Sequence, residues 1–246
     1  MTVAKNIKNI FIDLDDTLYD FSAASRESFN EAYDLLGYDK YFQSFQQFME
    51  IYTPRNLQLW EMYGRGEITK QELNEIRYSY PLEVVGVYDK ELAALFCKEA
   101  LSRIPTKNKL IPGAKELLDY LYPKYNLYIL SNGFQELQEH KMRTSNILHY
   151  FKELILSEHI GINKPRPEIF EYALQKTGST IDNSIMIGDM LETDIIGAHN
   201  IGLQQIYYNS KGISPTKNEE CKKEINPATT IPTYEVKSLK EIIGIL

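Results

Sequence analysis

The chain has little of what several classes of protein require. Only two of its 246 residues are cysteines, Cys97 and Cys221, which is too few for the disulfide framework of a small secreted domain. Neither lies in a Cys-x-x-Cys or Cys/His cluster, which argues against a zinc site and favours reduced thiols. No segment approaches the roughly 18 consecutive apolar residues of a membrane helix.

An excess of positive charge is also missing. The chain has 27 Lys and Arg against 34 Asp and Glu, a formal net charge of −7, whereas binding a nucleic acid polymer requires a basic surface. Lys5 and Lys8 precede a short apolar run, but aspartates from Asp13 onward interrupt it too early for a secretory signal peptide. We therefore expect a cytoplasmic protein that binds neither membranes nor nucleic acid polymers.

Five or six short apolar runs predict buried strands. Most of them lack an alternation of apolar and polar residues, as expected when both faces of a sheet are covered. The runs span residues 8–14, 126–131, 153–157, 184–188, 204–208 and 233–236.

Helical patterns separate these runs. One helix is expected after Pro112-Gly113, and others over residues 134–147, 167–177 and 194–201, with a capped final helix from Ser238. The alternation of strand and helix predicts an α/β fold with a parallel, Rossmann-like sheet. Residues 211–232 are polar and contain three prolines, a pattern that predicts a long surface loop.

The segment 19–103 interrupts this alternation. It is helical in pattern and contains many aromatic residues, among them Phe29, Tyr33, Phe45, Phe48, Tyr52, Trp60 and Tyr63. We interpret it as an α-helical cap inserted after the first strand, in which most of these rings pack against one another. The α/β core then comprises residues 1–18 and 104–246.

Polar residues follow four of the predicted strands. Because ligands bind at the carboxyl ends of parallel strands, these residues are expected to converge. They are Asp13 and Asp15, then Ser131 and Asn132, then Lys164, and finally Asp189 with Asp194. Adjacent carboxylates repel each other, so a site that keeps Asp13 and Asp15 ionised usually holds a cation. The pattern indicates a metal-assisted reaction with a carboxylate nucleophile.

Each of these residues also has an ordinary structural explanation. Aspartates after strands form turns and cap helices, Ser131 precedes an Asn-Gly turn, and Lys164 precedes two nearby prolines in a loop. Taken singly, those explanations suffice. Taken together, in this order and at strand ends, coincidence is a poor explanation.

The set resembles the motifs of the haloacid dehalogenase-like (HAD) superfamily of aspartate-nucleophile hydrolases. The segment Asp13-Leu14-Asp15-Asp16-Thr17 is similar to the first motif, Ser131 to the second, Lys164 to the third, and Gly188-Asp189 with Asp194 to the fourth. The position of the inserted segment, between the first and second motifs, is similar to the helical C1-type cap of that superfamily.

The resemblance implies a Mg²⁺ cofactor. Asp13 and Asp189 would be its side-chain ligands and Asp15 would contribute a backbone carbonyl. Asp194 would orient these ligands or hydrogen-bond Lys164, whose point charge would face the phosphate and the nucleophile.

The resemblance also implies the chemical roles. Asp13 would attack phosphorus and form an aspartyl phosphate, and Asp15 would protonate the leaving group and then activate water. Ser131 and the backbone N–H groups of Asn132 and Gly133 would bind the phosphate oxygens. Asp16 would be structural, and Thr17 would support the turn.

Asp15 separates branches of the superfamily. Halide needs no proton, so an acid two residues after the nucleophile favours phosphate-ester chemistry over dehalogenation. A phosphomutase uses the same acid and stays open as an alternative. A binding protein that kept only the fold is disfavoured, because Asp13, Asp15, Lys164 and Asp189 are all present.

The cap carries a weaker resemblance to bacterial pyrimidine 5′-nucleotidases. It lies in the segment from Asn56 to Arg77, where Trp60 and Arg77 are candidates for reading the leaving group. The expected partner is a small phosphorylated metabolite, with a nucleoside 5′-monophosphate as the first choice. Phosphoglycolate and small sugar phosphates stay open as alternatives.

Overall fold

The computed structural model describes residues 6–212 and 232–246. The chain divides into two compact units, one formed by Met1–Asp20 with Lys109–Leu246 and the other by Phe21–Asn108. We call the first the core unit and the second the helical unit, and each is described by itself. Most of the loop predicted over residues 211–232 lies outside the described residues.

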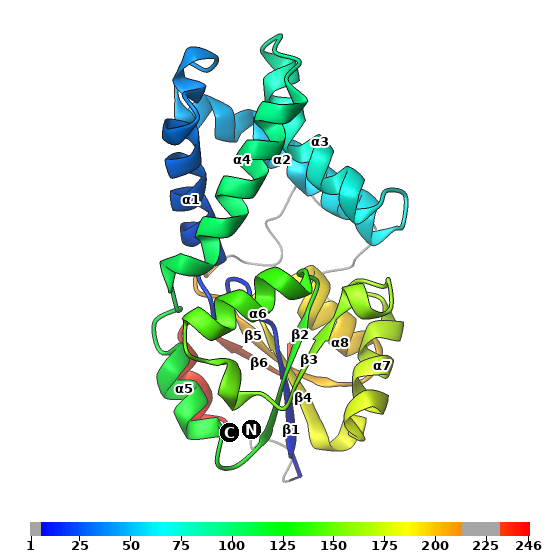
Figure 1. The fold of residues 1–246 in the computed structure, drawn as a ribbon. Coiled ribbons are helices and arrows are strands. Elements are labelled where there is room, and N and C mark those ends of the chain that lie inside the picture. Colours follow the sequence, from blue (N-terminus) through cyan, green and yellow to red (C-terminus); the bar gives the residue numbers. More distant parts are fainter. Residues whose placement is uncertain (1–5, 213–231) are drawn as a thin grey trace. The chain divides into compact units, whose positions relative to one another are not determined.

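The core unit contains a six-stranded parallel sheet (Figure 1). The strand order confirms the Rossmann-like α/β fold. In spatial order the strands are β3 (Glu153–Leu156), β2 (Asn126–Ser131), β1 (Asn9–Ile12), β4 (Ser184–Gly188), β5 (Gln204–Tyr208) and β6 (Tyr234–Val236). The strands β2, β4 and β5 have the bounds predicted from the sequence, whereas the others are shorter.

Helices cover both faces of this sheet. Helices α7 (Pro167–Thr177) and α8 (Ile196–Asn200) lie on one side, and α5 (Ala114–Leu121) lies on the other (Figure 1). Helix α6 (Gln135–Thr144) follows β2. The helix predicted over residues 194–201 begins instead with a π-helical turn, Leu191–Ile195, and the predicted final helix is the 3-10 helix η8 (Leu239–Gly244).

Short 3-10 helices complete the connections of the core unit. They are η3 (Leu148–Tyr150), η4 (Ser157–His159) and η5 (Ile181–Asn183). Gly178 caps the end of helix α7, and its φ of 64° lies in the left-handed region that glycine adopts without steric strain.

The central strand β1 is buried on both faces. Ile10, Phe11 and Ile12 are at most 1% exposed, and each such side chain contributes roughly 1.5–3 kcal/mol when fully removed from water. Phe11 packs with Ile169 and Phe170 of α7 in one hydrophobic cluster. This packing fixes the position of the residues that follow β1.

The strand order places a switch point beside β1. Strand β1 pairs with β2 on one side and with β4 on the other, and Ile12 is in register with both Ile129 and Ile187. In such sheets the connections leave in opposite directions and open a crevice at the carboxyl ends of the strands. The residues that follow β1 and β4 therefore emerge at the same level of the sheet.

The helical unit is made of four α-helices and two 3-10 helices. They are α1 (Phe21–Leu35), η1 (Tyr38–Lys40), α2 (Phe45–Gly64), α3 (Lys70–Val84), α4 (Lys90–Arg103) and η2 (Ile104–Lys107). Side chains of Ser44, Thr69 and Asp89 cap the first turns of α2, α3 and α4, which satisfies backbone donors that lack a partner within the helix.

Aromatic rings fill the interior of the helical unit. Phe29 contacts Tyr52, Tyr78 and Phe96 with ring centroids 5.1–6.0 Å apart, the spacing that favours edge-to-face packing. Cys97 is a free cysteine of this unit, and Cys221 lies outside the described residues.

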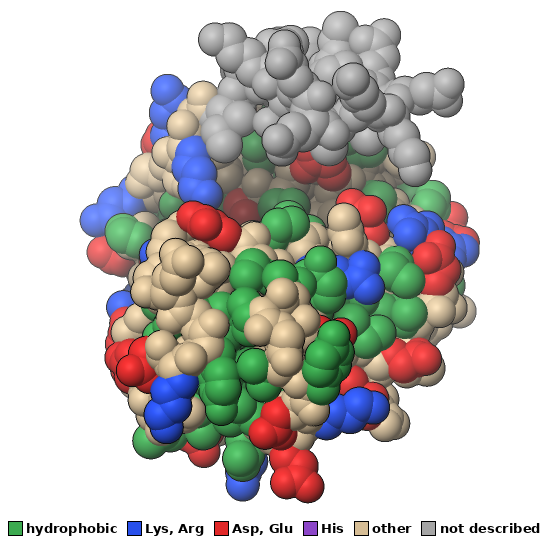
Figure 2. All heavy atoms as spheres, turned by 90° about the horizontal axis from the view of Figure 1, so that it is seen from above, with side chains coloured by type: hydrophobic (Ala, Val, Ile, Leu, Met, Phe, Trp, Pro, Cys, Tyr) green, Lys and Arg blue, Asp and Glu red, His purple; other side chains and the backbone are tan. Residues whose placement is uncertain are grey.

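Exposed large hydrophobic side chains are also frequent in the helical unit. They include Leu35, Leu57, Val84, Tyr88 and Leu95. Figure 2 shows one face of the molecule on which hydrophobic side chains gather in the middle and charged side chains of both signs lie around them. No helix among the described residues is both long enough and apolar enough to cross a membrane.

Candidate active site

The turn after β1 brings Asp13 and Asp15 to the switch point. The backbone N–H of Asp13 donates to the carbonyl of Ile187 at 2.9 Å, which extends the contact between β1 and β4 by one residue. The N–H groups of Leu18 and Tyr19 both donate to the carbonyl of Leu14 and close the turn. Asp16 occupies the left-handed region with φ 58°, a conformation that aspartate tolerates better than most residues.

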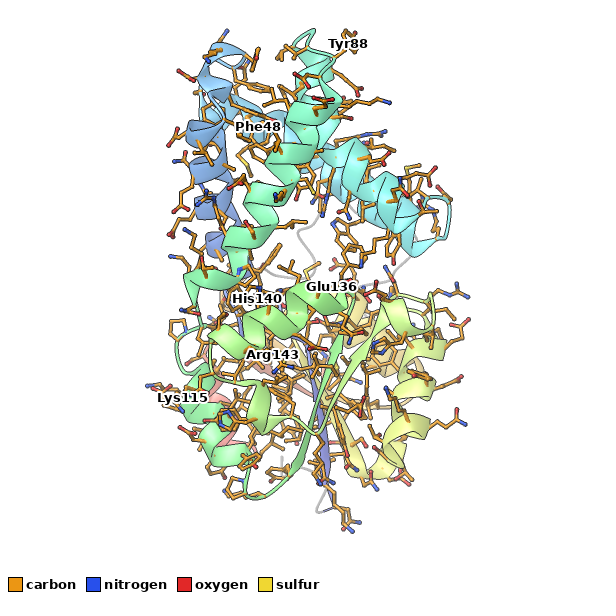
Figure 3. The ribbon with its side chains drawn as sticks, viewed as in Figure 1. Phe48, Tyr88, Lys115, Glu136, His140 and Arg143 are labelled. Atoms are coloured by element: carbon orange, nitrogen blue, oxygen red, sulfur yellow. The ribbon has the colours of Figure 1, made fainter. Side chains whose placement is uncertain are left out.

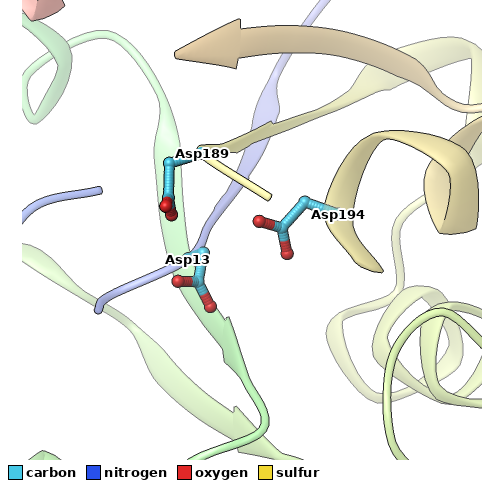
Figure 4. Close-up of side chains that lie close together, drawn as sticks. All are labelled: Asp13, Asp189 and Asp194. Carbon is cyan, nitrogen blue, oxygen red and sulfur yellow. The ribbon is translucent and has the colours of Figure 1, made fainter. Parts of the chain in front are cut away.

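Three carboxylates meet at this point (Figure 4). Oxygens of Asp13, Asp189 and Asp194 all lie within 4.8 Å of one another. Asp189 follows β4 directly, and Asp194 belongs to the π-helical turn. Gly188 permits this approach, because a β-carbon at that position would collide with the carboxylate of Asp194. Asp13, Asp189 and Asp194 are thus brought together from two neighbouring strand ends.

Lys164 lies inside the acidic cluster. Its Nζ donates to Oδ1 of Asp13 at 2.6 Å, to Oδ1 of Asp194 at 2.6 Å and to the carbonyl of Leu130 at 2.7 Å. These contacts use all three hydrogens of the ammonium group. Because Lys164 is only 4% exposed, its charge is compensated by the two carboxylates rather than by water.

The pKa values of three residues in the cluster, Asp13, Asp189 and Lys164, are raised. Burial raises the pKa of Asp13 well above its usual value, and the carboxylates of Asp194 and Asp189 raise it further, against the opposing effect of Lys164. Burial and the neighbouring Asp194 raise the pKa of Asp189 to about 7. Burial alone would lower the pKa of Lys164, but Asp13 and Asp194 outweigh it and raise that pKa.

A divalent cation fits this charge distribution. Asp13, Asp189, Asp194 and Lys164 carry three negative charges and one positive charge when all are ionised, so two negative charges lack compensation. The carboxylate oxygens are hard ligands of the kind that Mg²⁺ prefers. Asp13, Asp189 and Asp194 could therefore hold a divalent metal ion, which would offset the repulsion that adds to the effect of burial on the pKa values of Asp13 and Asp189.

Thr17 and Asn132 support the cluster through hydrogen bonds. The hydroxyl of Thr17, expected to support its own turn, donates across the crevice to Oδ1 of Asp189 at 2.7 Å. Oδ1 of Asn132 accepts from the N–H of Lys164 at 2.8 Å, and its Nδ2 donates to the carbonyl of Lys164 at 3.1 Å. The Asn132 side chain thus fixes the backbone that carries Lys164.

The loop after β2 differs in part from the expected phosphate cradle. Ser131 is 2% exposed and its hydroxyl accepts from the N–H of Gly133 at 3.1 Å. The N–H of Gly133 was expected to face a phosphate, but it is engaged within its own loop. Ser131 itself lies at the end of β2, beside the carbonyl of Leu130 that binds Lys164.

Two residues that contact Asp15 were not found from the sequence. Gln138 donates from Nε2 to Oδ2 of Asp15 at 3.0 Å, and Nζ of Lys141 pairs with Oδ1 of Asp15. Both side chains come from α6 and are fully buried. A signal was present, because both polar residues fall in the buried stripe of the helix that Phe134 and Met142 define.

Trp60 and Arg77 lie in the helical unit. Arg77 is 6% exposed, and its guanidinium carbon lies 5.9 Å from the centroid of the Trp60 ring and 4.8 Å from that of Tyr78. Its Nη2 donates to Oδ1 of Asn74. The two candidate specificity residues are therefore neighbours of each other within this unit.

Comparison with known proteins gives the family. Residues 7–202 match the haloacid dehalogenase-like hydrolases. The chain belongs to this family. The match spans the first strand, the helical unit and the strand ends that carry Ser131, Lys164, Asp189 and Asp194, so it covers every motif on which the resemblance in the sequence was based. This HAD-family membership makes the protein a hydrolase.

Three relatives each cover at least 84% of this chain. The HAD-hydrolase YfnB of Bacillus subtilis is 29% identical over 243 residues, 98% of this chain and 96% of that protein. Its magnesium-bound crystal structure gives a TM-score of 0.81 at 28% identity, with 98% and 99% of the two chains covered. Pyrimidine 5′-nucleotidase YjjG of Escherichia coli is 33% identical over 84% of this chain and 91% of its own. Pyrimidine 5′-nucleotidase PynA of Streptococcus pneumoniae is 28% identical over 97% and 94%.

Proposed function

We propose that this protein is a Mg²⁺-dependent phosphatase that hydrolyses a small phosphate monoester through an aspartyl phosphate on Asp13, with nucleoside 5′-monophosphates as the substrate class. The observation that carries the proposal is the buried cluster in which Asp13 shares Lys164 with Asp194 and lies beside Asp189. A nucleophilic carboxylate next to an ammonium group and an uncompensated pair of negative charges suits an anionic substrate that arrives with a divalent cation.

The structure supports Asp13 as the nucleophile. Oδ1 of Asp13 accepts a hydrogen bond from Lys164 at 2.6 Å. Oδ2 of Asp13 is therefore the oxygen assigned to attack phosphorus. The attack forms the Asp13 O–P bond and breaks the bond from phosphorus to the ester oxygen. Asp13 and Asp189, with the backbone carbonyl of Asp15, would bind Mg²⁺. Bound Mg²⁺ supplies positive charge that offsets the repulsion between the carboxylate and the phosphate oxygens.

Asp15 is assigned the proton transfers. Its carboxyl group gives a proton to the departing alkoxide and later takes one from the water that hydrolyses the aspartyl phosphate. The products are an alcohol and inorganic phosphate, and both aspartates return to their starting state. With 29% of its side chain exposed, Asp15 is accessible from solvent, unlike the buried Lys164. The Ser131 hydroxyl would donate to a phosphate oxygen, and Lys164 would offer the phosphate a positive point charge from its place beside Asp13.

Asp15 also favours a phosphate ester over an organic halide. Loss of halide requires no acid, whereas an alkoxide leaving group does. The nucleoside assignment is supported by two relatives named pyrimidine 5′-nucleotidases, at 33% and 28% identity. Trp60 beside Arg77 in the helical unit supplies an aromatic face and a cation, which suit a nucleobase or ribose phosphate.

The direct test is phosphate release over a panel of phosphorylated metabolites. The panel contains pyrimidine and purine nucleoside 5′-monophosphates, phosphoglycolate and small sugar phosphates, each assayed with Mg²⁺ and with EDTA. We expect release that requires Mg²⁺, is fastest with a pyrimidine nucleotide and disappears in Asp13→Asn. Activity of Asp13→Asn near that of the parent would refute the nucleophile. An isomerised product without released phosphate would identify a phosphomutase instead.

A further inference from the structure

Helix α6 carries two side chains, Gln138 and Lys141, that bind the carboxyl group of Asp15, the proposed acid. Neither residue belongs to a motif expected from the sequence, and we call the pair the clamp. We propose that Gln138 and Lys141 are positioning residues that fix the Asp15 carboxyl group and direct the Ser131 hydroxyl toward the phosphate. The inference rests on the phosphatase function proposed above and deepens it. It joins two residues with different roles, one for the leaving group and one for phosphate, through the same helix.

Lys141 fixes one oxygen of Asp15. The two residues are separated by 126 positions in the sequence, yet Nζ of Lys141 pairs with Oδ1 of Asp15. The Lys141 side chain is 0% exposed, and its Nζ also lies 5.4 Å from the centroid of the Tyr19 ring. A buried ammonium is retained only against a large desolvation cost, and Asp15 compensates the charge of Lys141 whenever its carboxyl group is ionised.

Gln138 fixes the other oxygen. Its Nε2 donates to Oδ2 of Asp15 at 3.0 Å and to Oγ of Ser131 at 2.7 Å, which uses both amide hydrogens. Rotation of the amide would place its oxygen against a carboxylate, so the observed orientation is the favourable one. Its Oε1 is buried without a hydrogen-bond partner in the described part of the chain, which shows that the contacts made by nitrogen determine the orientation.

The same contact sets the direction of the Ser131 hydroxyl. Oγ accepts one hydrogen bond from the N–H of Gly133 at 3.1 Å and a second from Nε2 of Gln138 at 2.7 Å. A hydroxyl oxygen has two acceptor positions, and both are now occupied. The hydroxyl hydrogen must point elsewhere, so Ser131 is prepared to act as a donor to an incoming phosphate oxygen.

Gly133 is what allows the clamp to form. A β-carbon on Gly133 would collide with the side-chain amide of Gln138. Since Gln138 and Lys141 are three residues apart on α6, they lie on the same side of the helix. Residues of the same helix that face away are exposed, among them Glu136, His140 and Arg143 (Figure 3).

Loss of Gln138 and loss of Lys141 should have different effects on the kinetics. The bonds from Gln138 and Lys141 hold the plane of the Asp15 carboxyl and leave further lone pairs for the proton in transit. Loss of Lys141 should therefore impair the two proton transfers assigned to Asp15, to the leaving group and from water, without weakening the binding of phosphate. Loss of Gln138 should also release the Ser131 hydroxyl and weaken the binding of phosphate itself.

The test compares Lys141→Met and Gln138→Leu with the parent on an alkyl phosphate and on p-nitrophenyl phosphate, whose leaving group needs little protonation. For Lys141→Met we expect kcat/KM, which reports the steps up to departure of the leaving group, to fall about 10²-fold on the alkyl ester and only a few-fold on p-nitrophenyl phosphate, with unchanged inhibition by inorganic phosphate. For Gln138→Leu we expect the same split together with a several-fold weaker inhibition by inorganic phosphate.

Arg143→Met is the matched control, because Arg143 is a cation on the same helix with 64% of its side chain exposed. We expect it to resemble the parent on both esters. Equal losses of kcat/KM on both esters in Lys141→Met would overturn the positioning role, as would a parent-like kcat/KM on the alkyl ester. The phosphatase assignment is judged separately, because Asp13→Asn and Mg²⁺ dependence test it in protein with an intact α6.

Discussion

Each unit of the molecule contains a buried cation, and the two are stabilised in different ways. In the core unit Lys164 is 4% exposed and pairs with Asp13 and Asp194. In the helical unit Arg77 is 6% exposed, but in the described chain it pairs with no carboxylate and contacts the rings of Trp60 and Tyr78 instead. Its Nε is buried without a hydrogen-bond partner among those residues.

The difference predicts that the stability of the fold depends more on Lys164 than on Arg77. Removing one partner of a buried ion pair leaves the other charge uncompensated. Removing a buried cation that lacks an anionic partner leaves no such charge behind and ends its desolvation cost. The contrast predicts that loss of Lys164 destabilises the protein more than loss of Arg77 does.

The largest effect is expected from Lys164→Met. Without the ammonium, Asp13 and Asp194 face each other in a buried site, so we expect a loss of about 3–5 kcal/mol in the free energy of unfolding. Phosphate release should fall by at least about 10²-fold, because the positive charge beside Asp13 is removed. Denaturant titration and the phosphate assay measure the two effects.

Lys176→Met is the control for that substitution. Lys176 pairs with Glu153 at the surface of the core unit, at 2.9 Å with 31% of its side chain exposed, and such pairs contribute at most about 1 kcal/mol. If both lysine variants lost equal stability, the buried cluster would have no special role in the fold.

The second effect is a pH-dependent stabilisation by Mg²⁺ that involves only the core unit. In metal-free protein the pKa of Asp189 is raised from 3.8 to about 7, first by burial. Its contribution to stability is therefore full below pH 3.8 and is lost as the pH rises through about 7. Because Mg²⁺ competes with protons for these carboxylates, the increase in Tm on adding Mg²⁺ should be about 5 °C larger at pH 8 than at pH 5. An equal increase at both pH values would contradict the raised pKa.

Arg77→Met should have a smaller effect on stability. We expect the free energy of unfolding to stay within about 1 kcal/mol of the parent, because the lost cation–π and hydrogen-bond contacts are offset by the desolvation that is no longer needed. Arg26→Met, which removes an exposed cation 5.5 Å from the Phe45 ring, is the matched control. A loss of unfolding free energy as large as that of Lys164→Met would contradict the difference between the buried cations of the two units.

The smallest effect concerns substrate choice. Trp60→Leu should change the ratio of kcat/KM between a pyrimidine nucleotide and p-nitrophenyl phosphate by about 10-fold, the order of one lost stacking contact, without altering the Mg²⁺ requirement. Steady-state kinetics on the two substrates measure that ratio. Uniform losses on both would assign Trp60 to the packing of the helical unit.

The sequence predicted the parts of the site that topology determines. Asp13 and Asp189 follow strands, and Ser131 ends a strand, that the apolar runs indicated, and parallel pairing then requires these strand ends to meet. The HAD family match extends over the same segments. The parallel sheet was predicted from the alternation of strands and helices along the sequence.

The parts that depend on helix rotation and side-chain direction were not predicted. Gln138 and Lys141 reach Asp15 because α6 is oriented about its axis so that both side chains face the site. The sequence pattern does not define this orientation closely enough to predict the two contacts. The π-helical turn that carries Asp194 was predicted as ordinary helix. Asp194 accepts hydrogen bonds there from Lys164 and from the backbone N–H of Met190, contacts that the apolar pattern does not indicate.

The central claim is that Asp13 accepts the phosphoryl group, and one measurement tests it most directly. Enzyme mixed with Mg²⁺ and a nucleoside 5′-monophosphate is quenched in acid during turnover, digested, and analysed by mass spectrometry. We predict a peptide that contains residue 13 and carries the added mass of one phosphoryl group on Asp13, absent from Asp13→Asn. Turnover in which the phosphoryl group is found on another residue would contradict the account.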